Sequence, residues 1–131
     1  MYDKNGYLLR KQMPNQTMIQ TVDADGNLTK QVIQGTYETS TTEYEYDVNH
    51  PGLPDPLALF REGKGSRNLL IKSTTRVVQM DSSIFKPYSV STSHSYEFDE
   101  RNRVKKQTSL IINTNEGYRP SVTVSDFVYS N

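Results

Sequence analysis

The sequence predicts an all-β protein, an antiparallel up-and-down meander of about eight strands forming a curved sheet or partial barrel. Turn motifs recur along the chain, strand-like runs rich in Thr, Val and Tyr separate them, and apolar and polar residues alternate within several runs. The chain has 131 residues, a length that fits a single all-β domain over residues 1–131.

Composition narrows the classes of function. The chain has 15 Lys and Arg against 15 Asp and Glu, interspersed along its length, which argues against a nucleic-acid partner. It has no cysteine, and therefore no disulfide, thiolate zinc ligand or cysteine nucleophile. Only 34% of the residues are hydrophobic, but 9 Tyr and 4 Phe favour a thin, half-buried sheet over disorder. No stretch approaches the roughly 18 apolar residues of a membrane span.

Three turn motifs share one spacing. An Asp is followed three residues later by Gly or Asn, and two residues after that by Leu or Val. Asp at the first position of a type I turn caps backbone N–H groups, and the third following position needs a positive φ that Gly and Asn tolerate. The spacing therefore predicts hairpin tips with an adjacent bulge. The motifs are Tyr2-Asp3-Lys4-Asn5-Gly6-Tyr7-Leu8, Val22-Asp23-Ala24-Asp25-Gly26-Asn27-Leu28 and Phe98-Asp99-Glu100-Arg101-Asn102-Arg103-Val104.

The strands are expected between these tips. A fourth tip, Tyr46-Asp47, begins like the others and opens into a longer loop. In a meander, all four tips fall at the same end of the sheet. The other turns are expected at Pro14-Asn15, Glu38–Ser40, Asp81–Lys86 and Asn113–Gly117. The predicted strands are 7–13, 16–22, 27–37, 41–47, 67–79, 87–98, 103–113 and 119–130.

One insertion, residues 48–66, breaks the pattern with three prolines and three glycines. Within it, residues 55–63 predict a short helix, with Asp55 as N-cap, Pro56 at the first helical position and Gly63 as the stop. This helix is expected to cover one mouth or face of the sheet. A binding loop is the alternative, because long loops at a sheet end often carry function.

No catalytic, metal or cofactor site is predicted. His50 and His94 lack metal-ligand spacing and are interpreted as surface or packing residues. The Asp-rich tip that starts at Asp23 is no EF-hand, because its glycine falls at the fourth position and Gln34 stands at the twelfth. Nucleophile elbows, P-loops and dinucleotide fingerprints are absent from the sequence.

Glutamates alternate with aromatic residues in two predicted strands. The residues are Glu43, Tyr44, Glu45 and Tyr46 in one, and Tyr96, Glu97 and Phe98 in the other. The glutamates could in principle act as a glycosidase pair. If the aromatic rings pack inward, however, the carboxylates face water. The tyrosines are interpreted as strand residues, with ligand stacking as the alternative.

The tips resemble the YD-type repeats of bacterial cell-surface proteins, in which a Tyr-Asp pair precedes Gly and Leu. With residues 66–72 and 96–99 included, the chain is similar to an uncharacterised family of lipoproteins from gut Gram-negative bacteria, described as having a porin-like fold. The resemblance implies a partial barrel in the outer membrane or periplasm, anchored through an upstream lipidated Cys that is not in this sequence. It carries over no catalytic residues.

We therefore expect a non-enzymatic binding or adhesion module of the cell envelope. The partner is either a glycan, as in a polysaccharide-uptake system, or a protein; a hydrolase is the third hypothesis. Because Met1-Tyr2-Asp3 starts at a hairpin tip, the chain is expected to be trimmed at its N-terminus. Strand 7–13 is then an edge that pairs with a second copy as a homodimer, or is covered by strand 119–130 in a closed barrel.

Overall fold

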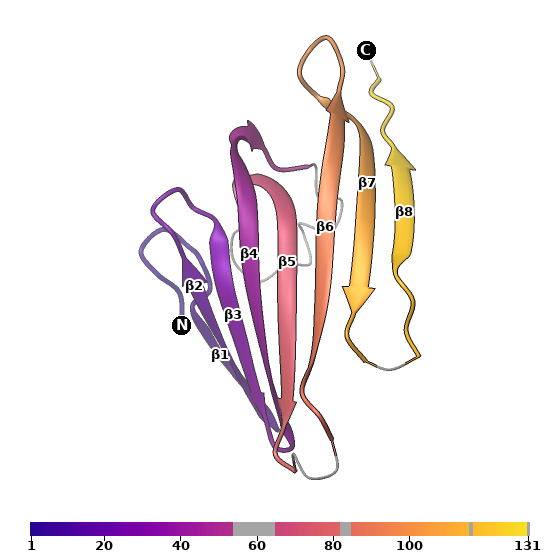
Figure 1. The fold of residues 1–131 in the computed structure, drawn as a ribbon. Coiled ribbons are helices and arrows are strands. Elements are labelled where there is room, and N and C mark those ends of the chain that lie inside the picture. The colour runs from indigo at the N-terminus through magenta and orange to yellow at the C-terminus, as the bar shows by residue number, and fades with distance from the viewer. Residues whose placement is uncertain (54–64, 82–84, 116, 131) are drawn as a thin grey trace.

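The computed structural model describes residues 1–53, 65–81, 85–115 and 117–130. Among these residues it contains eight antiparallel strands in one sheet, each hydrogen-bonded to the next along the chain (Figure 1). The all-β meander is confirmed. The strands are β1 (Arg10–Met13), β2 (Gln16–Val22), β3 (Leu28–Gly35), β4 (Glu38–Pro51), β5 (Asn68–Gln79), β6 (Tyr88–Phe98), β7 (Val104–Asn113) and β8 (Ser121–Asp126).

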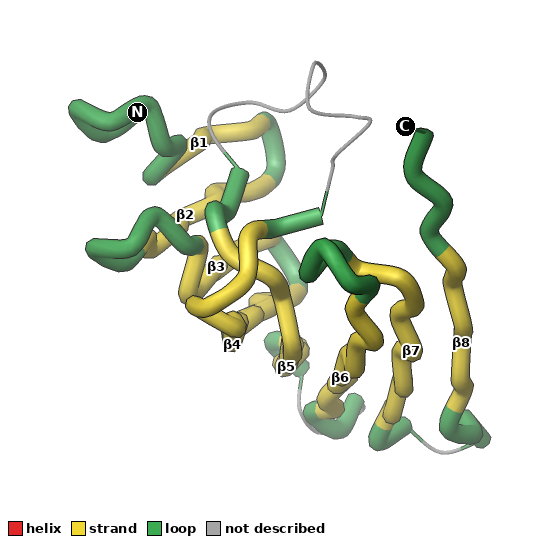
Figure 2. The backbone as a smooth tube through the Cα atoms, turned by 90° about the horizontal axis from the view of Figure 1, so that it is seen from above, coloured by secondary structure: helices red, strands yellow, loops and turns green. Residues whose placement is uncertain are grey.

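The sheet is strongly curved and open. Seen from above, the strands follow an arc from β1 to β8, with the two termini at its two ends (Figure 2). Strand β8 pairs with β7, and β1 pairs with β2. The expectation that the C-terminal strand closes a barrel over the first strand is therefore wrong.

The two faces of the sheet differ in burial. Tyr44 and Tyr96 are half-buried, whereas Glu43, Glu45 and Glu97 are exposed, as the alternation predicts. In a curved single sheet, the concave face is the more crowded one, so we call the face that carries Tyr44 and Tyr96 the inner face. On the outer face, Glu45 stands opposite Lys72 and Glu97 opposite Lys106.

The apolar core is small. Among the described residues, only four hydrophobic side chains are buried, and Leu69 is the least exposed of them at 1%. The others are Leu8, Val77 and Val104. The described residues include no helix that is long and apolar enough to cross a membrane. With so little buried apolar surface, stability depends strongly on hydrogen bonds at the ends of the strands.

The Asp turns form as the spacing predicts. Gly6, Gly26 and Asn102, each three residues after an Asp, have φ of 87°, 85° and 59°. In each turn the Asp backbone oxygen accepts from this residue, and its carboxylate accepts from the N–H four residues on. The tips lie at one end of the sheet, shown at the top of Figure 1. We call this the tip end.

A bulge adjoins three of the tips. The register shifts between Thr21 and Val22, between Glu45 and Tyr46, and between Glu97 and Phe98. Each shift leaves one extra residue on the following strand, which increases the local twist. The repeated motif therefore specifies a turn together with the bend of the strands below it.

Several predicted boundaries need correction. Glu38–Ser40 is not a turn, because β4 begins at Glu38 and the turn lies at residues 36–37. Strand 41–47 is too short, since β4 continues past Asp47 to Pro51. Strands 7–13 and 119–130 are shorter than predicted, because β1 starts at Arg10 and β8 spans Ser121–Asp126. The helix predicted at 55–63 lies outside the described residues.

Candidate polar binding site at the hairpin tips

Residues 65–68, which lead into β5, join the β2–β3 tip to β5. The N–H of Arg67 donates to the oxygen of Gly26 at 3.2 Å, and the N–H of Leu28 donates to Ser66 Oγ at 2.9 Å. From β4, the Tyr46 hydroxyl donates to the oxygen of Leu28 at 2.7 Å and lies 2.8 Å from Ser66 Oγ. These hydrogen bonds join β3, β4 and the β2–β3 tip to the segment that leads into β5.

A reciprocal pair of asparagines is at the centre of this junction. Asn27 Nδ2 donates to Asn68 Oδ1, and the Asn68 N–H donates to Asn27 Oδ1, both at 2.9 Å. Asn68 Nδ2 donates in turn to the oxygens of Val48 and His50 at 3.2 Å. Asn27 is completely buried, and its amide is satisfied. Because Asn27 is buried and its side chain is hydrogen-bonded to Asn68, the pair fixes the geometry of the surrounding loops.

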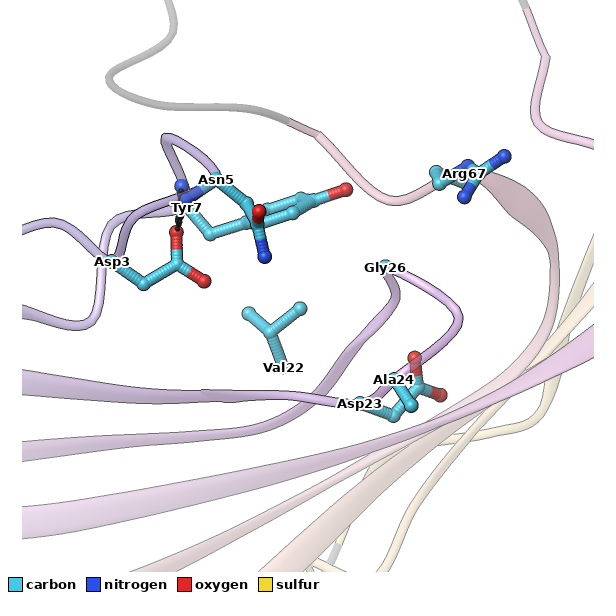
Figure 3. Close-up of a pocket in the computed structure, with 8 residues that line it drawn as sticks. All are labelled: Asp3, Asn5, Tyr7, Val22, Asp23, Ala24, Gly26 and Arg67. Carbon is cyan, nitrogen blue, oxygen red and sulfur yellow. Dashed lines mark hydrogen bonds between the residues drawn. The ribbon is translucent and has the colours of Figure 1, made fainter.

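Two polar cavities flank Arg67 at the tip end. The first, of about 370 Å³, lies between the tips that begin at Asp3 and Asp23 (Figure 3). The second, of about 340 Å³, also has Arg67 in its lining. Both volumes fall at the lower end of the roughly 300–1,000 Å³ typical of ligand pockets. The first is lined by Asp3, Asn5, Tyr7, Val22, Asp23, Ala24, Gly26 and Arg67, and the second by Asp25, Val48, Asn49, His50, Pro51, Arg67 and Asn68.

Gly26 forms the floor between Tyr7 and Arg67. A Cβ at this position would stand 2.5 Å from the Tyr7 hydroxyl and 2.6 Å from Arg67 Cδ. Figure 3 shows the Tyr7 ring extending toward Arg67 above Gly26. The missing side chain of Gly26 thus allows the aromatic ring and the guanidinium side chain to approach each other.

His50 joins this end of the sheet to the β6–β7 tip. Its ring stacks on Phe98, with centroids 4.1 Å apart and planes 14° apart. Its Nδ1 lies 2.6 Å from Asp47 Oδ2, and its Nε2 lies 3.1 Å from Asn102 Oδ1. A protonated imidazole donates from both nitrogens and satisfies both oxygens. The hydrogen bond to Asp47 therefore raises the pKa of His50 above its ordinary 6.5.

The pKa values of the two histidines are expected to lie on opposite sides of 6.5. The pKa of His94 is lowered by burial. Protonated His50 thus stabilises the fold below pH 6.5, and this contribution is lost as the pH rises through its raised pKa. Neutral His94 supports the fold above pH 6.5, and its contribution is lost as the pH falls through its lowered pKa. Imidazole NMR titration measures both values.

Asp47→Asn is the matched variant for this measurement, because the amide oxygen can still accept from the Asn49 N–H. We expect it to lower the pKa of His50 and to leave that of His94 unchanged. Equal pKa values for the two histidines, or a His50 value that Asp47→Asn does not move, would contradict the assigned contacts.

The remaining sequence candidates lie apart from the cavities. His94 is half-buried in β6, where its Nδ1 lies 2.7 Å from Ser109 Oγ. Tyr44, Tyr46 and Tyr96 are half-buried in the sheet, and burial raises their pKa. In the part of the chain that the structure describes, no group of three or more His, Cys, Asp or Glu could hold a metal ion.

Sequence reasoning missed Asn27, Arg67 and Asn68. The turn motif placed Asn27 in a tip but gave no reason for its complete burial. One signal was available: the two other complete motifs have Tyr7 and Arg103 at the equivalent position, so a short amide there departs from the repeat. No local pattern marked Arg67 and Asn68 as site residues, because the residues with which they hydrogen-bond lie about 40 positions earlier in the chain.

These features define an open all-β meander with two polar cavities at its tip end. No known protein family, curated protein or solved structure matches the chain.

Proposed function

We propose that the protein is a non-enzymatic binding module of the bacterial cell envelope, and that its tip end binds a glycan. The observation that carries the proposal is the pair of polar cavities that share Arg67. Carboxylate and amide oxygens accept hydrogen bonds, whereas amide nitrogens and the guanidinium donate them. A sugar with several neighbouring hydroxyl groups, each both donor and acceptor, matches this mixture.

The rigidity of the site supports binding. Asp3 Oδ1 accepts from the N–H groups of Asn5 and Tyr7 at 2.9 Å, which fixes one wall of the first cavity. The Asn27–Asn68 pair fixes the opposite wall. Side chains held before the ligand arrives lose less conformational entropy on binding.

The cell-envelope assignment is based on the sequence resemblance. The motif Tyr2-Asp3 followed by Gly6 and Leu8 is the one that resembles YD-type repeats. In the structure this motif is a hairpin tip, and the tips beginning at Asp3 and Asp23 together line the first cavity. The part of the chain that carries the resemblance is thus also the part that carries the proposed site.

Arg67→Ala tests the proposal. On an array of neutral and acidic oligosaccharides, the parent chain is expected to bind a defined set. Arg67→Ala should weaken that binding roughly tenfold or more, because a charge-assisted hydrogen bond contributes about 1.5–3 kcal/mol. Titration calorimetry with the strongest oligosaccharide gives the affinity.

Arg101→Ala is the matched control, because it removes the same charge from an exposed position in the β6–β7 tip. Its affinity should stay within about twofold of the parent. An array without reproducible binding, or equal losses in both variants, would refute glycan binding at this site. Turnover of an oligosaccharide that one acidic substitution abolishes would favour the hydrolase hypothesis.

A further inference from the structure

The two edges of the sheet differ in their protection against pairing. Strand β1 has only four residues, carries Arg10 and Lys11, and is followed by Pro14, three features that discourage pairing with another strand. Strand β8 is exposed along its whole length and carries no charge before Asp126. Strand β8 is therefore the edge that is open to a partner.

An apolar strip borders this edge on the outer face. Leu110 stands opposite Val122 and Thr108 opposite Val124, so Val122, Val124, Leu110 and Ile112 share one face. Their exposed fractions are 64%, 54%, 37% and 45%. Such contiguous exposed apolar residues indicate an interaction surface.

Among the described residues, the backbone groups of β8 that have no strand partner lie at valine positions. The Phe127 N–H donates to the oxygen of Lys105 in β7 at 3.0 Å. Backbone groups alternate in direction along a strand, so those of Thr123 also face β7, whereas those of Val122 and Val124 face outward. A second strand could therefore hydrogen-bond at Val122 and Val124.

The sequence of β8 is symmetric about Thr123, since it reads Ser121-Val122-Thr123-Val124-Ser125. We propose that β8 pairs antiparallel with β8 of a second copy, with a two-fold axis at Thr123. Val122 of each copy then exchanges both main-chain hydrogen bonds with Val124 of the other. The two apolar strips become continuous, as an isologous interface requires.

The flanking residues fit this register. Asp126 falls opposite Pro120 of the second copy, at each end of the pairing. Pro120 has no N–H, so the ladder ends there. The partner is therefore a second copy of this chain, and the contact leaves the tip-end cavities unobstructed.

A single cysteine tests the register directly, because the chain has none of its own. In the proposed pairing, Thr123 faces Thr123 of the second copy as a pair without hydrogen bonds, about 4.5 Å apart between Cα atoms, within disulfide range. Thr123→Cys should form a disulfide-linked dimer under mild oxidation roughly tenfold or more faster than Ser125→Cys. Ser125→Cys is the matched control, since residue 125 faces residue 121 of the second copy.

Sedimentation provides a second readout. The parent chain should dimerise, Val124→Lys should be monomeric, and Val128→Lys, which adds the same charge beyond β8, should still dimerise. Circular dichroism checks that each variant keeps its sheet. A parent chain that stays monomeric, or equal crosslinking rates for Thr123→Cys and Ser125→Cys, would overturn the proposal. The crosslinking and sedimentation results do not depend on glycan binding, so Arg67→Ala should dimerise like the parent chain even where it no longer binds a glycan.

Discussion

Asn27→Ala is expected to lower the free energy of unfolding by roughly 3 kcal/mol. The substitution removes the buried partner of the N–H and Oδ1 of half-buried Asn68, and each group left unpaired away from water costs about 1–3 kcal/mol. The loss is large for this fold, because few apolar side chains are buried elsewhere among the described residues. Urea denaturation monitored by circular dichroism measures it.

Asn49→Ala is the matched control for this substitution. Asn49 is exposed, and its backbone N–H, which alanine keeps, donates to Asp47. We expect a change within about 0.5 kcal/mol. The double variant Asn27→Ala/Asn68→Ala should lose less than the sum of the two single variants, because removing both partners leaves fewer unpaired groups. Equal losses for Asn27→Ala and Asn49→Ala would show that the buried pair does not hold the tip end.

Gly26→Ala is expected to lower the free energy of unfolding by roughly 3 kcal/mol and to weaken glycan binding. A left-handed conformation costs a non-glycine residue about 1–2 kcal/mol. Overpacking adds about 1–3 kcal/mol, because the new methyl group displaces Tyr7 and Arg67. Thermal unfolding and calorimetry measure the two effects.

Gly117→Ala separates the backbone cost from the steric cost. Gly117 has φ of 84°, almost the same as Gly26, but among the described residues, its chain neighbours aside, no atom lies within 4 Å of the position that a Cβ would take. Gly117→Ala should lower the free energy of unfolding by about 1 kcal/mol and leave the glycan affinity unchanged. If the two alanine variants are equally stable and bind equally well, the close approach of Tyr7 and Arg67 over Gly26 is not important for the site.

The strands and tips could be predicted from the sequence because their determinants are local. An Asp with Gly or Asn three residues later specifies a tip by backbone sterics alone, and Gly6, Gly26 and Asn102 have the positive φ that this spacing demands. The alternation of Glu43 and Tyr44 likewise assigns the two faces. The misplaced turn at Glu38–Ser40 shows the limit of such patterns, since Ser and Thr occur both in turns and in exposed strands.

The site could not be predicted because its determinants are distant in sequence. Asn27 meets Asn68, and Gly26 meets Arg67, only after residues 65–68 return to the β2–β3 tip. The stack of His50 on Phe98 likewise joins residues from different hairpins. No local spacing encodes these contacts, so the sequence marked the tips as turns and gave no sign that they line a common cavity.

An NMR titration of the ¹⁵N-labelled chain with the strongest oligosaccharide from the array tests the central claim most directly. If the tip end is the binding site, the largest chemical-shift changes will fall on the backbone amides of Asn5, Gly26 and Arg67, which line the first cavity. Shifts confined to β7 and β8, or to the turn around Tyr37 at the opposite end of the sheet, would contradict it.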